Sequence, residues 1–363
     1  MRRDARNAHA PRAPAAASGR ALVLASTVAP LSAGAGIAAQ QPTRYVERVD
    51  VARIIVDARV LDDRGSPVTG LTADDYKVSI DGKPARVETA TWVGGPTADV
   101  DGAPPESTPR DAGAPADPGR LIVFVFQKDF EGSRLVGLMR MLLKSRGVLD
   151  TLTPDDRVAI LSFDFHLKIW SDFTNDRERL DRILAHDLLL EQPPAVLASP
   201  WPSLIDRLDP DSGRRTYGIE RALELIGQAL QPLPGSKSLV LIGYGFGRLG
   251  PSGVVMENNY GAARQALVDS RTSVFSLDVT DADYHSLEAG LQLVSGQTGG
   301  FYSKTNVFPD RALRQLAGAL AGYYVLFVER PEARRTVHDI KTELTRRKGN
   351  VLATTSLSER EPH

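Results

Sequence analysis

The run of six apolar residues Leu121–Phe126 constrains the fold of this chain more than any other stretch. It is short, uniformly apolar and rich in β-branched and aromatic side chains, which predicts a strand buried on both faces of a parallel sheet. A polar loop, 127–133, follows at once, and a helical pattern begins after it. In a doubly wound α/β sheet, ligands bind beyond the carboxyl ends of such strands. We therefore expect any functional site of this chain to lie near this loop.

Strand-like and helix-like segments alternate along the chain from residue 119 to residue 328. A shorter alternating stretch, Leu167–Trp170, predicts an antiparallel strand beside the second β-prone run. The alternation implies right-handed crossovers, so we predict an α/β fold with a doubly wound, mostly parallel, Rossmann-like sheet flanked by helices over residues 119–328. The later β-prone runs, which lie between helical patterns, are 157–163, 238–242, 273–279 and 323–328.

A small β module is predicted at residues 44–93, before the α/β domain. Tyr76–Ile80 alternates with period two, Asp81-Gly82 is a strong signal for a two-residue hairpin turn, and Ala85–Trp92 would complete the hairpin. Residues 94–118 then become rich in Pro, Gly, Ala and Asp without apolar periodicity, which predicts a linker.

The end of the chain departs from the alternating pattern. Residues 329–356 contain two β-prone stretches around the turn Lys348-Gly-Asn350, which predicts a C-terminal hairpin. This hairpin could pair with the N-terminal β module. Residues 357–363 are expected to form a tail.

The first forty residues have the order of a secretory signal. Five arginines precede the apolar stretch 21–31, and small residues follow up to Ala39, with cleavage expected after Ala38 or Ala39. Pro30 and nearby glycines interrupt the apolar stretch, so we expect no integral membrane segment beyond the signal peptide. The chain would then be exported and lie in the periplasm, on the outer surface or outside the cell. A disordered Ala/Arg/Pro tail is the alternative.

The composition excludes several functional classes. A length of 363 residues suits one large or two smaller domains. The formal net charge of -1 gives no electrostatic case for binding nucleic acid or an acidic membrane surface. The chain has no cysteine, which excludes disulfides, thiolate metal sites, a cysteine nucleophile and a lipoprotein acceptor.

No constellation typical of catalysis is evident in the sequence. His285 and His338 are isolated, and paired carboxylates such as Asp281 and Asp283 lie in loops, where they act as caps or turn residues. We therefore expect that the chain is not an enzyme.

Several short motifs together resemble one protein family. They are Val68–Tyr76 with Asp81–Pro84, Asp156–Phe163 with Asp172–Asp176, Thr298–Phe301 and Tyr323–Val328. In this order they are similar to the exported, acidobacterial-type bacterial proteins related to the von Willebrand factor type A domain, over about residues 44–356. The resemblance implies that domain's α/β fold.

The resemblance also implies a metal-ion-dependent adhesion site. In the family, Asp-x-Ser-x-Ser after the first strand, a Thr before a central helix and a later Asp hold Mg²⁺, a hard ion that prefers oxygen ligands. Here Gln127-Lys128-Asp129 begins the first motif, Thr216 fills the Thr position, and Tyr244 replaces the later Asp. We expect a degenerate site with no bound metal and no other cofactor.

An alternative keeps the metal. A register shifted by two residues would place Asp129, Glu131 and Ser133 as Mg²⁺ ligands together with Thr216. This shift requires a longer strand or a bulge, and Tyr244 still replaces the last carboxylate. It leaves Mg²⁺-dependent adhesion as a second hypothesis.

A third hypothesis comes from the glycines Gly245, Gly247 and Gly250. They match G-x-G-x-x-G, the phosphate-binding turn of dinucleotide enzymes. Pro251-Ser-Gly253 interrupts the sequence where a helix should begin, so we favour a Gly-rich surface loop over a nucleotide site.

The function predicted from the sequence is therefore protein interaction without catalysis and without metal. The partner, a protein that the sequence does not identify, would bind at the rim formed by the loops 127–134, 211–217 and 243–255. The rim residues expected to contact it are Gln127, Lys128, Asp129, Thr216 and Tyr244.

Overall fold

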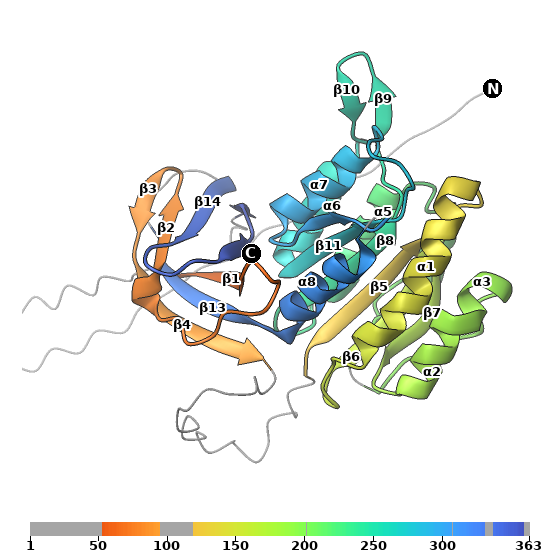
Figure 1. Cartoon of the computed structure of the whole chain (residues 1–363), viewed down its shortest axis with the longest axis horizontal. Coiled ribbons are helices and arrows are strands. Elements are labelled where there is room, and N and C mark those ends of the chain that lie inside the picture. Colours follow the sequence, from red (N-terminus) through yellow and green to blue (C-terminus); the bar gives the residue numbers. More distant parts are fainter. Residues whose placement is uncertain (1–52, 95–118, 201, 307, 331–336, 359–363) are drawn as a thin grey trace, which may run out of the picture. The chain divides into compact units, whose positions relative to one another are not determined.

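The computed structural model describes residues 53–94, 119–200, 202–306, 308–330 and 337–358 (Figure 1). These residues belong to one compact unit. The expected signal segment 1–40 lies outside them, as does the expected linker apart from Gly94.

The chain order of the elements is shown in Figure 1. The strands are β1 Arg53–Leu61, β2 Tyr76–Ile80, β3 Lys83–Ala85, β4 Val87–Gly94, β5 Leu121–Gln127, β6 Arg157–Phe163, β7 Leu167–Thr174, β8 Lys237–Gly243, β9 Arg248–Gly250, β10 Gly253–Val255, β11 Thr272–Asp278, β12 Tyr302–Lys304, β13 Gly322–Glu329, β14 Val337–Leu344, β15 Asn350–Ala353 and β16 Ser356–Ser358. The helices are η1 Ala73–Asp75, α1 Gly132–Leu149, α2 Arg177–Arg182, the π-helix η2 Ile183–Asp187, α3 Leu188–Leu190, α4 Pro210–Arg214, α5 Ile219–Leu230, α6 Tyr260–Asp269, α7 Glu288–Gln297 and α8 Pro309–Ala321.

A six-stranded sheet in the order β12-β11-β8-β5-β6-β7 forms the centre of the α/β domain. All its pairings are parallel except that of β7 with β6. Counted within the sheet, this is the doubly wound order 3-2-1-4-5-6 read from the β7 edge, so the predicted mostly parallel sheet is confirmed. The antiparallel strand predicted at Leu167–Trp170 is also confirmed, as part of β7. Additional sheets lie outside this one.

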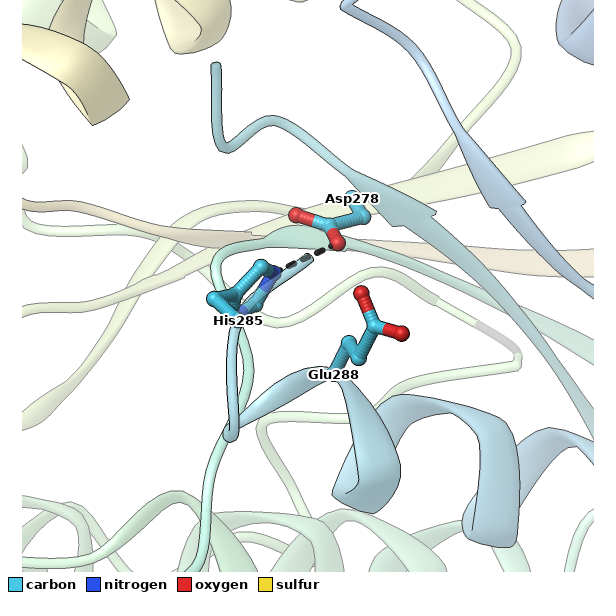
Figure 2. Close-up of side chains that lie close together, drawn as sticks. All are labelled: Asp278, His285 and Glu288. Atoms are coloured by element: carbon cyan, nitrogen blue, oxygen red, sulfur yellow. Dashed lines mark hydrogen bonds and ion pairs between the residues drawn. The ribbon is translucent and has the colours of Figure 1, made fainter. Parts of the chain in front are cut away.

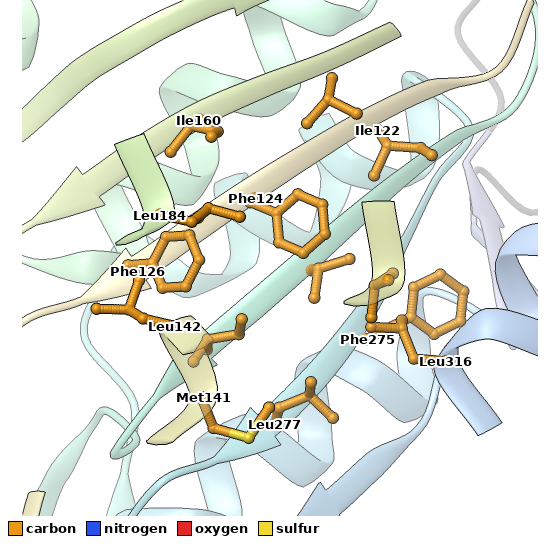
Figure 3. Packing of buried hydrophobic residues seen from close by; sticks show 14 of the residues in the cluster. Ile122, Phe124, Phe126, Met141, Leu142, Ile160, Leu184, Phe275, Leu277 and Leu316 are labelled. Carbon is orange, nitrogen blue, oxygen red and sulfur yellow. The ribbon is translucent and has the colours of Figure 1, made fainter. Parts of the chain in front are cut away.

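Strand β5 is buried on both faces, as its sequence predicts. Ile122, Phe124 and Phe126 pack into one core, which contains side chains of α1, α2, η2 and α8 (Figure 3). Val123 and Val125 pack into a second core on the opposite face, with side chains of α5, α6 and α7. Because successive side chains of a strand alternate between its faces, a strand covered by helices on both sides needs an unbroken apolar run.

The strands before and after the α/β domain join into two four-stranded sheets, β15-β1-β13-β4 and β16-β14-β2-β3. Their shared core includes Val56, Val78, Leu326 and Ile340. The α/β domain is thus inserted in the chain between β4 and β13 of this second unit.

The expected last strand of the α/β domain, Tyr323–Val328, is the main correction to the sequence prediction. As β13, it pairs antiparallel with β1 and β4 instead of joining the parallel sheet. Its burial alternates towards its end, unlike the uniform burial of β5 and β8. The α/β sheet ends instead at the three-residue strand β12.

The predicted hairpins are also only partly correct. The turn at Asp81-Gly82 is confirmed, with φ of 51° and 77°, but β3 ends at Ala85 and the following strand, β4, pairs with β13. At the C-terminus, β14 pairs with β2 while β15 pairs with β1, so the two strands lie in different sheets and do not form one hairpin. Pairing with the N-terminal module is confirmed, and β16 extends the ordered β structure into the expected tail.

Candidate functional site

The carboxyl ends of β5, β6, β8 and β11 lie at one edge of the six-stranded sheet, here named the carboxyl edge. Gln127 pairs with Phe163, and Gly243 pairs with Asp278. The chain leaves β5 and β8 towards opposite sides, so the boundary between these two strands is the topological switch point where doubly wound sheets bind ligands. The sequence placed the candidate site at this point, through Gln127 and Tyr244.

Gln127 is bonded to the loop that follows β8. Its Nε2 donates to the carbonyl oxygen of Gly245 at 2.8 Å, and its Oε1 accepts from the backbone N–H groups of Tyr244 and Gly245, both at 3.2 Å. The side chain is buried. A Cβ at Gly243 would stand only 2.7 Å from the Cβ of Gln127, so glycine permits this close approach. The amide joins the loops that follow β5 and β8. In the von Willebrand type A-like family that the sequence resembles, this position holds the first carboxylate of the metal site.

Lys128 does not present its charge to the rim. Its Nζ donates to the carbonyl oxygen of Leu188 at 2.8 Å and lies 5.7 Å from the centre of the Trp170 ring. Asp164 is 3.9 Å away. Burial lowers the pKa of the ammonium, although the charge of Asp164 raises it in part. This side chain packs into the protein.

The candidate ligands Asp129, Glu131 and Ser133 lie at and just before the start of α1, around Arg134. The Arg134 guanidinium bonds to Asp129 and lies 3.2 Å from a Glu131 carboxylate oxygen, while Ser133 donates to Glu131 at 3.1 Å. Burial raises the pKa of Asp129, but the hydrogen bonds and charge of Arg134 outweigh it and lower the pKa below its ordinary value. Arg134 also stacks 4.3 Å from the Tyr244 ring centre. A cation of the protein itself therefore already neutralises these carboxylates.

Thr216, the fourth candidate ligand, is engaged elsewhere. Its Oγ1 donates to the carbonyl oxygen of Ser212 at 2.7 Å, and the residue is only 1% exposed. Mg²⁺ needs several oxygen donors and usually retains water in an octahedral shell. With Thr216 bonded to the backbone of Ser212 and the carboxylates of Asp129 and Glu131 held by Arg134, these residues do not fit the ion.

A cavity of about 780 Å³ opens beside the switch point. Gln127 and Tyr244 line it together with Tyr217, Glu220, Arg221 and Glu257. Thus Gln127 and Tyr244, chosen from the sequence, belong to a real pocket. Glu220 was not identified from the sequence, because it lies within the apolar pattern of α5 and only its burial makes it unusual.

The glycines of the G-x-G-x-x-G match do not lead into a helix. Gly247 is followed directly by β9, which ends at Gly250 and pairs with β10 in a small hairpin. Binding of a pyrophosphate by this motif uses a helix N-terminus immediately after the glycines. The described residues form a hairpin there, so the context of a dinucleotide site is not met.

A second charged cluster lies at the end of β11 (Figure 2). Ligand atoms of Asp278, His285 and Glu288 all lie within 4.8 Å of one another. His285 Nε2 is 2.7 Å from the Asp278 carboxylate. His285 is isolated in the sequence and was not predicted to belong to a site. Asp278 ends a buried strand at the carboxyl edge, and this position could have singled it out.

This cluster is already satisfied by neighbouring side chains. The Tyr302 hydroxyl donates to Asp278 at 2.8 Å, and the Lys304 ammonium lies 2.7 Å from Glu288. Burial, followed by the charge of Asp278, raises the pKa of Tyr302, which therefore keeps its proton and remains a donor. Lys304 supplies the positive charge that a metal ion would otherwise supply, so the geometry indicates a structural network.

Large apolar side chains gather at the carboxyl edge on five separate loops, a set here named the apolar rim. Four of the loops follow β5, β6, β8 and β11, and the fifth precedes α5. Five of the seven most exposed large apolar side chains among the described residues belong to this rim. The other two are Leu190 and Leu197. Its members are Phe130, Phe165, Tyr217, Leu249 and Tyr284, each at least 71% exposed.

Comparison with known proteins gives likenesses of fold. No family model matches the chain, and no curated protein matches it. It is similar to von Willebrand factor type A from Catenulispora acidiphila, with a TM-score of 0.39 and 9% identity, covering 79% of this chain and 75% of that one. It is also similar to the conserved hypothetical protein BatB from Bacteroides thetaiotaomicron, with a TM-score of 0.35 and 14% identity, covering 55% of this chain and 97% of that one.

A third similar structure is an aerotolerance-related membrane protein from Bacteroides fragilis, with a TM-score of 0.36 and 15% identity, covering 56% of this chain and 98% of that one. The three similarities are weak, with TM-scores of 0.39 or less, and no property of these proteins is transferred to this chain.

Proposed function

We propose that this chain is an exported, non-enzymatic interaction protein that binds a partner protein at the carboxyl edge without a metal ion. The observation that carries this proposal is the apolar rim, in which five large side chains are exposed on separate loops at the carboxyl edge. One of them, Tyr217, also lines the pocket. Exposed apolar groups that gather in this way are typical of protein-binding surfaces, whereas singly scattered ones need no explanation.

Binding without metal is supported by the bonds of Gln127 and Arg134. Gln127 fills the first ligand position with an amide that is bonded to the opposite loop. Arg134 holds the carboxylates that a shifted register would offer to Mg²⁺. A partner would therefore meet side chains of the protein at this edge and not an ion.

The five partner-contacting residues predicted from the sequence are not members of the apolar rim, and they take different roles in this proposal. Gln127 and Thr216 are buried, so they shape the loops without touching a partner. Lys128 points its ammonium inward. Asp129 and Tyr244 both contact the Arg134 guanidinium. The contacts themselves would come from the apolar rim.

The exported location rests on the signal-like segment 1–40, which would place the protein in the periplasm, on the outer surface or outside the cell. None of the helices in the described part of the chain is long and apolar enough to span a membrane. A non-enzymatic role is supported by the Asp278 cluster, whose groups are bonded to Tyr302 and Lys304.

Selection of random peptides displayed on phage, with the full chain as bait and EDTA present, tests this function. We expect peptides whose binding is lost in the triple variant Phe165→Ser, Tyr217→Ser, Leu249→Ser, because all three side chains are exposed members of the rim. Leu143→Ser, which removes an exposed apolar side chain of α1, is the matched control and should bind normally. Failure to select any rim-dependent peptide in EDTA would contradict the proposal. So would a parallel selection with Mg²⁺ in place of EDTA, if it yields rim-dependent peptides whose binding EDTA abolishes.

A further inference from the structure

Glu220 is a buried acid in the wall of the pocket at the switch point. It is the second residue of α5 and is 3% exposed, and it lines the cavity together with Gln127 and Tyr217. Its Oε1 has no hydrogen-bond partner among the described residues. Charged groups are rarely buried without a partner, because removal from water disfavours the ionised form.

The electrostatic surroundings of Glu220 do not compensate its burial. Burial raises the pKa of the carboxyl group, and the charge of Glu257 raises it further. Backbone N–H groups of Glu220, Glu257 and Gly247 lower it only in part. Glu257 lies in the same pocket and is exposed, and no ion pair reaches it within the described ranges. No ion pair among the described residues neutralises either acid, although Arg215 and Arg221 also line the pocket.

Two other buried glutamates at this side of the sheet have the cation that Glu220 lacks. Glu224, one turn later on α5, lies 2.6 Å from Arg221. Glu288, at the start of α7, lies 2.7 Å from Lys304. Arg221 lines the pocket but is paired with Glu224, and Arg215 donates from Nε to the carbonyl oxygen of Asp211 at 3.3 Å.

Tyr217 provides an aromatic surface in the same pocket. Its ring is 75% exposed and packs edge-on against His166, with ring centres 5.5 Å apart. A guanidinium group can form two parallel hydrogen bonds with a carboxylate and also stack on an aromatic ring. Arginine combines both interactions, while lysine offers only a compact charge.

We propose that the pocket binds an arginine side chain of the partner protein, with the Glu220 carboxylate as its acceptor and Tyr217 as its stacking surface. This inference rests on the proposed function, because it names the chemistry of the partner at the same edge. The apolar rim would contact the residues on either side of that arginine.

The peptides selected on the full chain provide the test. We expect an arginine at one fixed position among rim-dependent peptides. In a synthetic peptide of that sequence, replacement of the arginine by citrulline keeps the shape but removes the charge, and it should weaken binding about tenfold or more. In Glu220→Gln, the arginine and citrulline peptides should bind about equally.

Glu178→Gln is the control variant, because Glu178 is an exposed acid in the first turn of α2 outside the pocket, and it should retain the full preference for arginine. Thermal unfolding of both variants verifies their fold, and the citrulline comparison on the unaltered chain needs no variant. Rim-dependent peptides with no arginine position, or equal binding of citrulline by the unaltered chain, would overturn the inference while leaving the proposed function in place. A lack of rim-dependent peptides would overturn both.

Discussion

At the end of β5, Gln127 uses both ends of its side-chain amide to hold the loop after β8. The amide is uncharged and its donor and acceptor are bonded to Gly245 and Tyr244, so it satisfies two buried backbone N–H groups and one carbonyl. A carboxylate at this position could accept but not donate. One residue type therefore changes what the edge can bind while the strand and its pairing are kept.

Asp156 forms a largely buried ion pair with Arg120 near the start of β5. It bonds to the Arg120 guanidinium through both oxygens and accepts from the Thr153 N–H at 2.6 Å. Asp156→Asn leaves a buried cation poorly compensated, so we expect the unfolding free energy to fall by about 3 kcal/mol in urea titrations at pH 7.

The sign of its pH dependence follows from the lowered pKa of Asp156. Burial raises that pKa, but the bonds and charge of Arg120 lower it more, to a net value below the ordinary 3.8. The stabilisation is present above pH 3.8 and is lost as the pH falls through the lowered value. The difference between wild type and variant should therefore shrink in acid; a difference that does not change with pH would contradict this.

Glu220 gives the opposite pH dependence. Its pKa is raised above the ordinary 4.5, mainly by burial, so the folded state binds the proton more tightly than the unfolded state. Its stabilising contribution is present at low pH and is lost as the pH rises from 4.5 through the raised value. Thermal unfolding should show Glu220→Gln gaining stability relative to wild type between pH 4 and pH 8. A difference in melting temperature between wild type and Glu220→Gln that stays constant over this range would contradict a buried carboxylate that lacks a cationic partner.

At this scale the sequence predicts positions better than partners. Gln127 and Tyr244 were placed at the correct edge, because the carboxyl ends of parallel strands have a fixed location in the fold. The pairing of His285 with Asp278 and the missing partner of Glu220 could not be predicted. Both depend on side chains brought together by loops, and loop geometry has no periodicity to reveal it.

Among the elements, α1 shows how closely helices pack on this sheet. A Cβ at Gly137 would overlap the carbonyl oxygen of Val279, whereas a Cβ at Gly147 in the same helix would have no neighbour within 4 Å. The helix thus approaches the loop after β11 most closely at Gly137, where a side chain is missing.

These two glycines provide a matched prediction. Gly137→Ala should lower the unfolding free energy by about 1–3 kcal/mol, because the backbone must shift to accommodate the methyl group. Gly147→Ala should raise it by about 0.5–1 kcal/mol, because alanine favours a helix interior. Urea unfolding measures both, and equal effects of the two substitutions would show that the close contact is absent.

Element types followed from the sequence wherever periodicity was strong. The apolar run of β5 and the period-two alternation of β2 and β7 predicted their structures correctly. The sequence did not predict which sheet β13 joins. An apolar, aromatic run of six residues suits a parallel core strand and an antiparallel strand of a separate sheet equally. Its antiparallel partners β1 and β4 come from the other end of the chain.

At the scale of the whole molecule, Arg59 of β1 links the two four-stranded sheets to the α/β domain. Its guanidinium donates to the Ala319 carbonyl oxygen at 3.1 Å, to Ser273 Oγ at 2.7 Å and to Ser238 Oγ at 3.2 Å. Burial lowers the pKa of Arg59 to about 10. Arg271 of the α/β domain bonds in return to Asp57 of β1.

Arg59→Leu should therefore destabilise the entire protein. It removes three donors and leaves buried acceptors unsatisfied, so we expect a loss of about 3 kcal/mol in one cooperative urea transition followed by circular dichroism. Arg53→Leu on the same strand removes an exposed pair with Glu88 and should change stability by less than about 0.5 kcal/mol. Similar losses in both variants would contradict the linking role of Arg59.

The central claim is that the partner protein binds at the carboxyl edge without a metal ion. Calorimetric titration of the purified full chain with Mg²⁺, after treatment with EDTA, tests this claim directly. Because Gln127 and Arg134 occupy the positions that a metal would need, we predict no saturable heat. A saturable signal with one site per chain that Thr216→Ala abolishes, in a variant shown to be folded by thermal unfolding, would contradict it.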